Sequence, residues 1–274
     1  MNSLKDKVMI VNLTISQWGA RKYDATATRE VESVYNAHEA GRFNKSLIKS
    51  DTLKEISAVA NKIRLNHYEL TLPWGDNGDR ILSTESYFKY ISEIGVLTAK
   101  FNELVEQFIQ EYYELKQEAK FRLNGLYKES DYPHEVDIKD KFKIRTVFMP
   151  IADAEDFRLN VSQDVAESIK NQITSEMNGR VAIAIDSVID RAKDVLTKIV
   201  ETLSEDGKIF RDSLIGNVES LVETMPLLNF NNDQRINDLA KAMSTIIVNP
   251  DPLRYDLRMR KEICNKAKAI LDTL

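Results

Sequence analysis

The sequence predicts a mainly α-helical protein of the α+β class, built on a long antiparallel helical hairpin with a small β-sheet and a C-terminal set of shorter helices. Three observations predict this architecture. Two long stretches, residues 83–124 and 162–204, carry apolar side chains at helical spacing. Short segments with alternating apolar residues precede and separate them. A chain of 274 residues with only 9 Gly and 6 Pro also contains few turns, which favours long helices over an all-β fold.

The amino-terminal part begins with a predicted strand. Residues 8–15 alternate apolar side chains and are rich in β-branched types, so they should form a strand buried on at least one face. A helix capped by Asp24 should then extend to Gly41, and a second helix should cover residues 51–68. Residues 73–79, which read PWGDNGD, break the chain before the long helix.

Residues 83–124 predict one long helix whose apolar residues follow a heptad rhythm typical of a coiled-coil seam. The row that alternates steps of four and three consists of Tyr87, Ile91, Ile94, Thr98, Phe101, Val105, Phe108, Tyr112, Leu115 and Ala119. Ser83 is expected to cap the amino end, and Asn124 to end the helix in the left-handed conformation. At about 1.5 Å per residue the helix would be about 60 Å long, so it must pair with another long helix or a second subunit.

A second apolar row flanks the first on the same helix and consists of Tyr90, Leu97 and Leu104. It makes the apolar stripe wider than a two-helix seam needs. These three side chains should contact either the amino-terminal helices or a second subunit. We therefore expect a homo-oligomer.

Two further segments predict strands in the middle of the chain. Residues 142–149 (FKIRTVFM) alternate apolar and polar side chains, and residues 157–161 (FRLNV) form a shorter candidate after an acidic loop. Together with residues 8–15 they would form a small three-stranded sheet. The order of strands in that sheet is not predictable from the sequence.

The second long helix is predicted over residues 162–204, with Ser162 as its cap. Its apolar spacing changes at Asn178 and Gly179, which indicates a kink or break there, with a continuous helix that carries a tolerated glycine as the alternative. This helix is the natural antiparallel partner of residues 83–124, and the two would form the hairpin.

Three shorter helices are predicted at the carboxyl end, over residues 208–224, 233–248 and 252–274. Pro226 should stop the first of them. Cys264 has apolar neighbours on one helical face, so it is interpreted as a small core residue and not as a nucleophile. We divide the chain into residues 1–205, which hold the hairpin, sheet and amino-terminal helices, and residues 206–274, a helical region that packs on the same core.

Composition and motifs exclude several classes of function. One cysteine and three scattered histidines argue against a Cys/His metal site, and no cofactor is expected. Phosphate-binding glycine loops and nucleophile elbows are absent, so we do not expect an enzyme. No apolar run is long enough for a membrane span. The net charge is −5, but residues 1–68 carry 11 Lys/Arg against 7 Asp/Glu, a balance of +4 that weakly favours an anionic partner.

Two loops contain both tryptophans, each followed by glycine at the end of a predicted element. The first holds Trp18, Arg21 and Lys22, and the second holds Trp74 and Asp76. An exposed tryptophan beside arginine and lysine can anchor a protein partner or stack on a base. The alternative is that both rings fill the core where the chain turns.

Segments along nearly the whole chain resemble an uncharacterised helical protein family of tailed phages and prophages. They read SLKDKVMIVNLTISQWGARKYD, GRFNKSLI, HYELTLPWGD, RLNGLY followed by DYP, DAEDFRLNVS and IFRDSLIGNVESLVE. Members are often encoded near MoxR-like AAA ATPases and von Willebrand factor A-type proteins. The resemblance implies a phage protein in the host cytoplasm with an AAA ATPase system as partner, and it carries no catalytic motif.

These inferences lead to one expected function and one alternative. We expect a non-enzymatic phage protein, an oligomeric helical scaffold or adaptor for a protein partner. The alternative is nucleic-acid binding in phage replication, recombination or nuclease inhibition. It would use the basic amino-terminal region and the carboxyl-terminal cations, which are Arg254, Arg258, Arg260, Lys261, Lys266 and Lys268. The overall acidity of the chain counts against the alternative.

Overall fold

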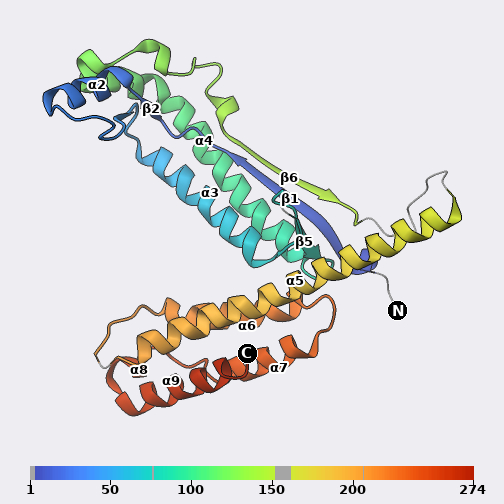
Figure 1. Cartoon of the computed structure of the whole chain (residues 1–274). Helices are drawn as coiled ribbons and strands as arrows, with labels where there is room; N and C mark the ends of the chain where they lie inside the picture. The colour runs from blue at the N-terminus through green and yellow to red at the C-terminus, as the bar shows by residue number, and fades with distance from the viewer. Residues whose placement is uncertain (1–3, 76, 152–161, 206) are drawn as a thin grey trace. The chain divides into compact units, whose positions relative to one another are not determined.

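The computed structural model of the chain describes residues 4–75, 77–151, 162–205 and 207–274, and it confirms a mainly helical protein with a small sheet and a long helix (Figure 1). The chain forms two compact units. Unit 1 combines Met1–Asn12, His67–Ile91 and Val147–Leu274, and unit 2 combines Leu13–Asn66 and Ser92–Thr146. Each unit is therefore assembled from segments that are distant in the sequence.

The larger sheet has four strands in the order β4-β5-β1-β6. These are β4 (Leu72–Pro73), β5 (Arg80–Ser83), β1 (Val8–Ser16) and β6 (Lys143–Met149). β5 is antiparallel to both neighbours, with Val8 opposite Ser83 and Leu72 opposite Ile81. A short helix, α1 (Leu4–Lys7), precedes β1.

The strands predicted at residues 8–15 and 142–149 are confirmed as β1 and β6. The third predicted strand, residues 157–161, and the acidic loop before it lie outside the described residues. β4 and β5 were not predicted. They pair with each other, and Trp74 N–H, directly after β4, donates to the carbonyl of Asp79, directly before β5 (3.1 Å).

The long helix α4 extends over Tyr87–Leu123 and begins four residues later than predicted. Ser83 belongs to β5, but its hydroxyl accepts a hydrogen bond from Ser86 N–H (3.1 Å) in the turn that precedes the helix. At the other end Asn124 has a φ of 44°, the left-handed conformation predicted for it. Three 3-10 turns, Asn124–Leu126, Glu129–Asp131 and Lys139–Lys141, then connect α4 to β6.

In unit 2, α4 lies beside α3 (Asp51–Glu69). The hydroxyl of Thr52 donates to Glu111 (3.0 Å), and the amide of Asn66 donates to Glu93 (2.5 Å). Helix α2 (Ala25–Val34) is capped by Asp24 as predicted, and its carboxylate accepts from the N–H groups of Thr26 and Ala27 at 3.1 Å. A two-stranded antiparallel sheet, β2 (Arg21–Tyr23) with β3 (Asn44–Ser46), replaces the loop and connector predicted there.

The second apolar row of α4 is largely buried inside this chain. Tyr90 is 0% exposed and Leu104 is 3% exposed, while Leu97 is partly buried. The hydroxyl of Tyr90 lies 2.8 Å from Nδ1 of His67 at the end of α3. The sequence predicted that this row contacts either an amino-terminal helix or a second subunit. Tyr90 contacts an amino-terminal helix, α3.

Unit 1 is organised around α5 (Gln163–Leu203), a continuous helix of 41 residues. The expected kink at Gly179 is wrong, and the continuous alternative holds. The predicted antiparallel pairing of the two long helices is also wrong, because residues 92–123 of α4 and all of α5 contribute to different units. Within its own unit α5 packs against α6 (Ser213–Leu228) and α9 (Leu257–Leu271).

The carboxyl-terminal helices complete one hydrophobic cluster with α5. Pro226 does not stop α6 but lies inside its last turn. α7 (Gln234–Ser244) follows, and the last predicted helix is two helices, α8 (Pro252–Tyr255) and α9, separated by Asp256, which caps α9. Cys264 is 4% exposed, which confirms its place in the core.

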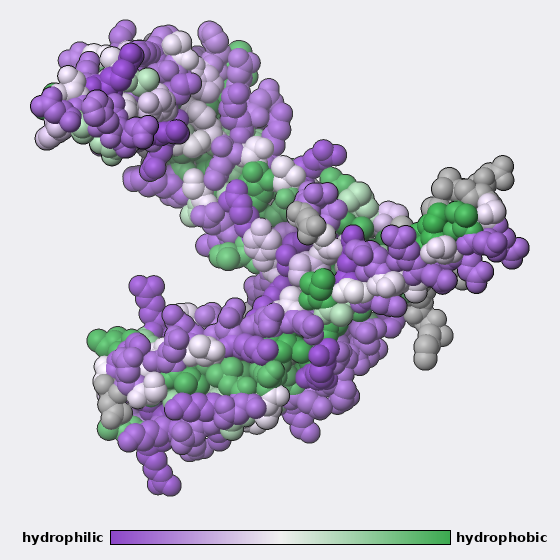
Figure 2. Space-filling view, viewed as in Figure 1, coloured by the Kyte–Doolittle hydropathy of each residue, from purple (hydrophilic) through white to green (hydrophobic). Residues whose placement is uncertain are grey.

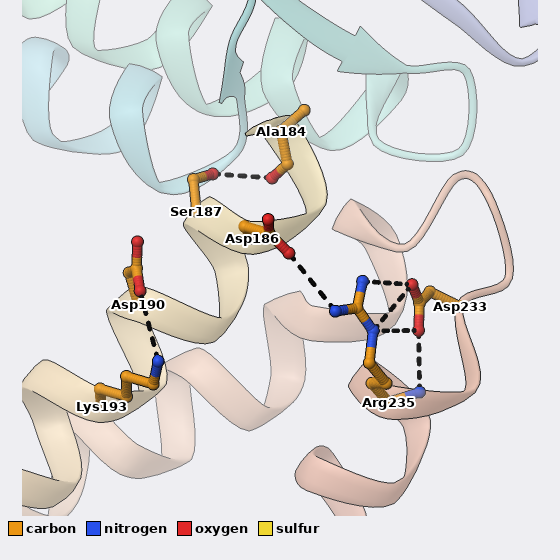
Figure 3. A network of polar contacts seen from close by, with 7 residues as sticks. All are labelled: Ala184, Asp186, Ser187, Asp190, Lys193, Asp233 and Arg235. Atoms are coloured by element: carbon orange, nitrogen blue, oxygen red, sulfur yellow. Dashed lines mark hydrogen bonds and ion pairs between the residues drawn. The ribbon is translucent and has the colours of Figure 1, made fainter. Parts of the chain in front are cut away.

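Figure 3 shows a polar contact between α7 and α5. The guanidinium of Arg235 donates to Asp233, the cap of α7, at 2.9 Å, and reaches Asp186 of α5 at 3.4 Å. Arg235 and Asp186 are both mostly exposed, so the ion pair between the two helices is weak. α7 itself packs against α6 and α9.

The predicted boundary between residues 1–205 and 206–274 does not coincide with the two units, because both sides of it contribute to unit 1. Among the described residues, no helix combines the length and the apolar character needed to cross a membrane.

Candidate binding groove beside Trp18

The candidate site is a groove of about 470 Å³ in unit 2, between the loop after β1 and the first turns of α3. Twelve residues line it: Trp18, Gly19, Arg21, Ser46, Ile48, Lys49, Ser50, Leu53, Lys54, Ser57, Ala58 and Asn61. Its wall is thus partly apolar and partly polar. We refer to it as the Trp18 groove.

Aromatic packing fixes Trp18 at the edge of the groove. Its ring centroid lies 5.8 Å from that of Tyr112 and 6.3 Å from that of Phe108, both buried residues of α4. Edge-to-face and tilted arrangements at these distances are favourable for aromatic rings. Trp18 itself stays partly exposed. The indole is therefore a rigid surface that a ligand can cover without ordering it first.

The backbone around the groove is equally constrained. Ala20 is buried and adopts a φ of 48°, a conformation that L residues seldom adopt outside fixed turns. Its carbonyl accepts from Leu47 N–H (2.8 Å), which joins the Trp18 loop to the segment after β3. The carbonyl of Leu47 in turn accepts from the guanidinium of Arg122 and the hydroxyl of Tyr132, both at 3.0 Å.

Charge in the groove has one sign. Arg21, Lys49 and Lys54 line it, and no lining residue is acidic. Lys54 pairs with Asp51 at 2.7 Å, but both side chains are mostly exposed, and such pairs are weak. An anionic ligand with an apolar or aromatic group would meet complementary surfaces here.

A buried ion cluster beneath the groove holds β3 in place. Lys45, which is 2% exposed, lies 2.8 Å from Asp24 and 2.7 Å from Asp131, and donates to the carbonyl of Leu126 (2.8 Å). Hydrogen bonds from Lys45 and then from Ala27 N–H lower the pKa of Asp24 to about 2. Burial alone would lower the pKa of Lys45, but the bonds to Asp131 and Asp24 raise it. Asp24 and Lys45 are therefore both charged at neutral pH.

The structure separates the site residues that the sequence suggested. Trp18 and Arg21 share the groove, whereas Lys22 is exposed on β2 and does not line it. Trp74 is 6% exposed and belongs to the core of unit 1. For this tryptophan the alternative interpretation, that the ring fills the core, is confirmed. Asp76 lies outside the described residues. The two tryptophan loops therefore belong to different units.

Sequence analysis missed most of the groove. Leu53, Lys54, Ser57, Ala58 and Asn61 lie at the spacing of one face of α3, and Ser50 directly precedes this helix. That spacing was visible in the sequence, but only the fold shows that this face meets Trp18. Among the described residues, no group of His, Cys, Asp and Glu side chains could hold a metal ion.

Comparisons of this chain with family models, with curated proteins and with solved structures find no match.

Proposed function

We propose that this chain is a non-enzymatic adaptor that binds an acidic segment of a protein partner in the Trp18 groove. The observation that carries the proposal is the combination of three cations and no carboxylate around an indole fixed on Phe108 and Tyr112. Tryptophan and arginine dominate the binding energy of protein interfaces, and preformed positions reduce the entropy lost on binding. Acidic side chains on the partner would pair with Arg21, Lys49 and Lys54.

The origin and the partner belong to the same proposal. The resemblance to tailed-phage proteins supports a phage protein that acts in the host cytoplasm as a helical scaffold or adaptor. It also supports an AAA ATPase system as the partner.

Affinity purification from cells that express the chain, followed by mass spectrometry, tests the proposal. We expect a protein that co-purifies with the wild-type chain to be lost with Trp18→Ala and with Lys54→Glu. Lys62→Glu is the matched control, since Lys62 is exposed on the same helix and does not line the groove. Retention of every partner by Trp18→Ala and Lys54→Glu, with both variants folded, would refute the groove as the binding site.

Self-association is a further part of the proposal. Val165 and Ile183 of α5 are 47% and 64% exposed, and apolar surface is visible at the amino end of α5 in Figure 2. A contiguous exposed apolar patch, such as the one at the amino end of this helix, can mark an interaction surface. Light scattering should give a mass above that of one chain at micromolar concentration, and Ile183→Glu should lower it. A single-chain mass throughout that range would exclude the homo-oligomer.

Nucleic-acid binding is the second candidate function. It is favoured by exposed aromatic residues on β2 and directly before β3. Tyr23 and Phe43 are 47% and 40% exposed, and the guanidinium of Arg42 lies over the ring of Tyr23 at 5.8 Å. Exposed aromatic rings among cations are typical of single-strand binding. The carboxyl-terminal cations support it less, because Arg260 is 3% exposed and Arg254 pairs with Asp212 and Asp251.

Fluorescence anisotropy with a single-stranded oligonucleotide separates the two candidates. Binding to nucleic acid should weaken steeply as salt increases, because phosphate contacts release counterions. No binding at low salt would eliminate this candidate and leave the protein partner.

A further inference from the structure

Two arginines of unit 1 that are distant in the sequence donate hydrogen bonds to the same backbone carbonyl. Nη2 of Arg80, on β5, donates to the carbonyl oxygen of Thr71 at 2.8 Å, and Nη2 of Arg191, on α5, donates to the same oxygen at 2.6 Å. Two guanidinium groups that share an acceptor must lie close together. The arrangement brings together two positive charges from different elements.

The described part of the chain holds no carboxylate in an ion pair with either arginine. Asp79 and Asp190 precede the two arginines in the sequence, but their carboxylates contact Asn12 (3.2 Å) and Lys193 (3.8 Å). Glu69 offers Arg191 its backbone carbonyl (3.2 Å), while its carboxylate accepts from the hydroxyl of Ser220. Both arginines are partly buried, and cations removed from water in this way are ordinarily paired.

Burial and the neighbouring charge both act against these cations. Burial, followed by the charge of Arg191, lowers the pKa of Arg80 to about 10. Burial also lowers the pKa of Arg191, although the charge of Glu69 opposes this. His67 adds no positive charge at neutral pH, because burial lowers its pKa to about 4. An anion placed here would relieve the repulsion between the two arginines.

The two side chains are also held in fixed positions. Nε of Arg80 donates to the hydroxyl of Thr71 (2.6 Å), and that hydroxyl donates to the carbonyl of His67. The ring of Tyr68 covers one face of Arg80, with 4.8 Å between the guanidinium carbon and the ring centroid. Each guanidinium has five N–H groups, and each uses only two of them in these bonds. Both side chains are partly exposed, so the remaining donors can reach a ligand.

We propose that Arg80 and Arg191 form a binding site for a compact oxyanion, either a phosphate group or a carboxylate. Planar guanidinium forks bind both kinds of oxyanion through paired N–H···O bonds. A bound oxyanion would link β5 to α5 within unit 1. The site is independent of the Trp18 groove, which belongs to unit 2, so either proposal can fail without the other.

Thermal unfolding of the full chain tests the site with three sodium salts: phosphate, acetate and chloride, at equal ionic strength. We expect phosphate or acetate to raise Tm above its value in chloride, by roughly 5 °C at about 100 times the Kd. Preference for phosphate would assign a phosphate group, and preference for acetate a carboxylate. Isothermal titration with the same two anions should show the same order.

Arg80→Gln and Arg191→Gln should each abolish the difference between salts. Arg258→Gln is the control, because Arg258 is exposed on α9 of the same unit and should leave the difference unchanged. If a Gln variant does not fold, Arg80→Lys and Arg191→Lys keep the charge but lose the fork, and should weaken anion binding at least tenfold in titration. Equal Tm values in all three salts, or a difference that survives both substitutions, would overturn the proposal.

Discussion

At the scale of single residues, His67 illustrates how burial turns a titratable side chain into a pH-dependent element of stability. It is 4% exposed, its Nδ1 lies 2.8 Å from the hydroxyl of Tyr90, and its ring packs against that of Tyr90 at 5.8 Å. Burial, and then the charge of Arg80, lowers its pKa from 6.5 to about 4. The folded state therefore holds the neutral ring, whereas the unfolded chain takes up a proton below pH 6.5.

This difference predicts a loss of stability as the pH falls. Between pH 6.5 and 4 the unfolded state binds more protons than the folded state, so stability is full above pH 6.5 and decreases toward pH 4. His67→Gln should be less sensitive than the wild type by about 2 kcal/mol between pH 7 and pH 4.5. Urea unfolding at the two pH values measures it. Equal pH dependence of the two proteins would show that His67 titrates normally in the folded state.

Lys45 predicts a second effect at the residue scale. Lys45→Met would leave the carboxylates of Asp24 and Asp131, on side chains that are 4% and 11% exposed, without their cation, so the free energy of unfolding should fall by more than it does when an exposed ion pair is removed. Denaturant titration measures the change, and Lys54→Met is the control because its ion pair is exposed. Adding Asp24→Asn and Asp131→Asn to Lys45→Met should restore part of the stability. A change no larger than that of the control would contradict the role of the cluster.

At the scale of elements, the continuity of α5 leads to a prediction at Gly179. A Cβ atom there would meet no atom within 4 Å, and the residue lies inside the helix. Gly179→Ala should therefore stabilise the protein by about 0.5 to 1 kcal/mol, because alanine loses less backbone entropy in a helix. Thermal unfolding measures the gain. Gly78→Ala should have the opposite effect on stability. Gly78 has a φ of 80°, which alanine adopts only with strain, so the substitution should destabilise the protein.

Helices and strands with a clear periodicity of apolar residues could be predicted from the sequence, but the elements that they pack against could not. The apolar rows of α4 and α5 identify both as long helices, but each row suits any apolar partner. The hairpin was inferred from the length and the similar apolar spacing of the two helices, and the fold pairs α5 with α6 and α9 instead. β4 and β5 have too few residues to show an alternation around the PWGDNGD turn. Pro226 is tolerated because it lies in the last turn of α6.

The same distinction applies to the Trp18 groove. Trp18 and Arg21 could be predicted because an aromatic and a cation beside glycine in a loop are locally unusual. Lys49 and Lys54 could not, because each is an ordinary solvent-facing cation until β3 and α3 are placed against the Trp18 loop. Arg80 and Arg191 are separated in the sequence by more than a hundred residues, and no local pattern relates them.

At the scale of the whole molecule, residues 206–274 depend on α5 for their core. The side chains of α6, α7 and α9 join one hydrophobic cluster with α5 residues such as Val188, Leu196 and Ile199. A fragment of residues 206–274 should therefore show no cooperative unfolding by circular dichroism, because it lacks the contacts that α6 and α9 make with α5. A fragment of residues 163–274 should retain more helix. Cooperative unfolding of the shorter fragment would show that it is a domain by itself.

The cluster of unit 1 extends from Val8 in the first strand to Ile270 in the last helix. During synthesis, this core cannot close until the ribosome has released α9, on the order of tens of seconds after β1 emerges. Unit 2 needs nothing beyond Thr146 and can fold while the rest is still being made. The apolar face of α5 stays exposed to solvent until α9 has been synthesised. The nascent chain is therefore most prone to aggregate or to bind chaperones between the synthesis of α5 and that of α9.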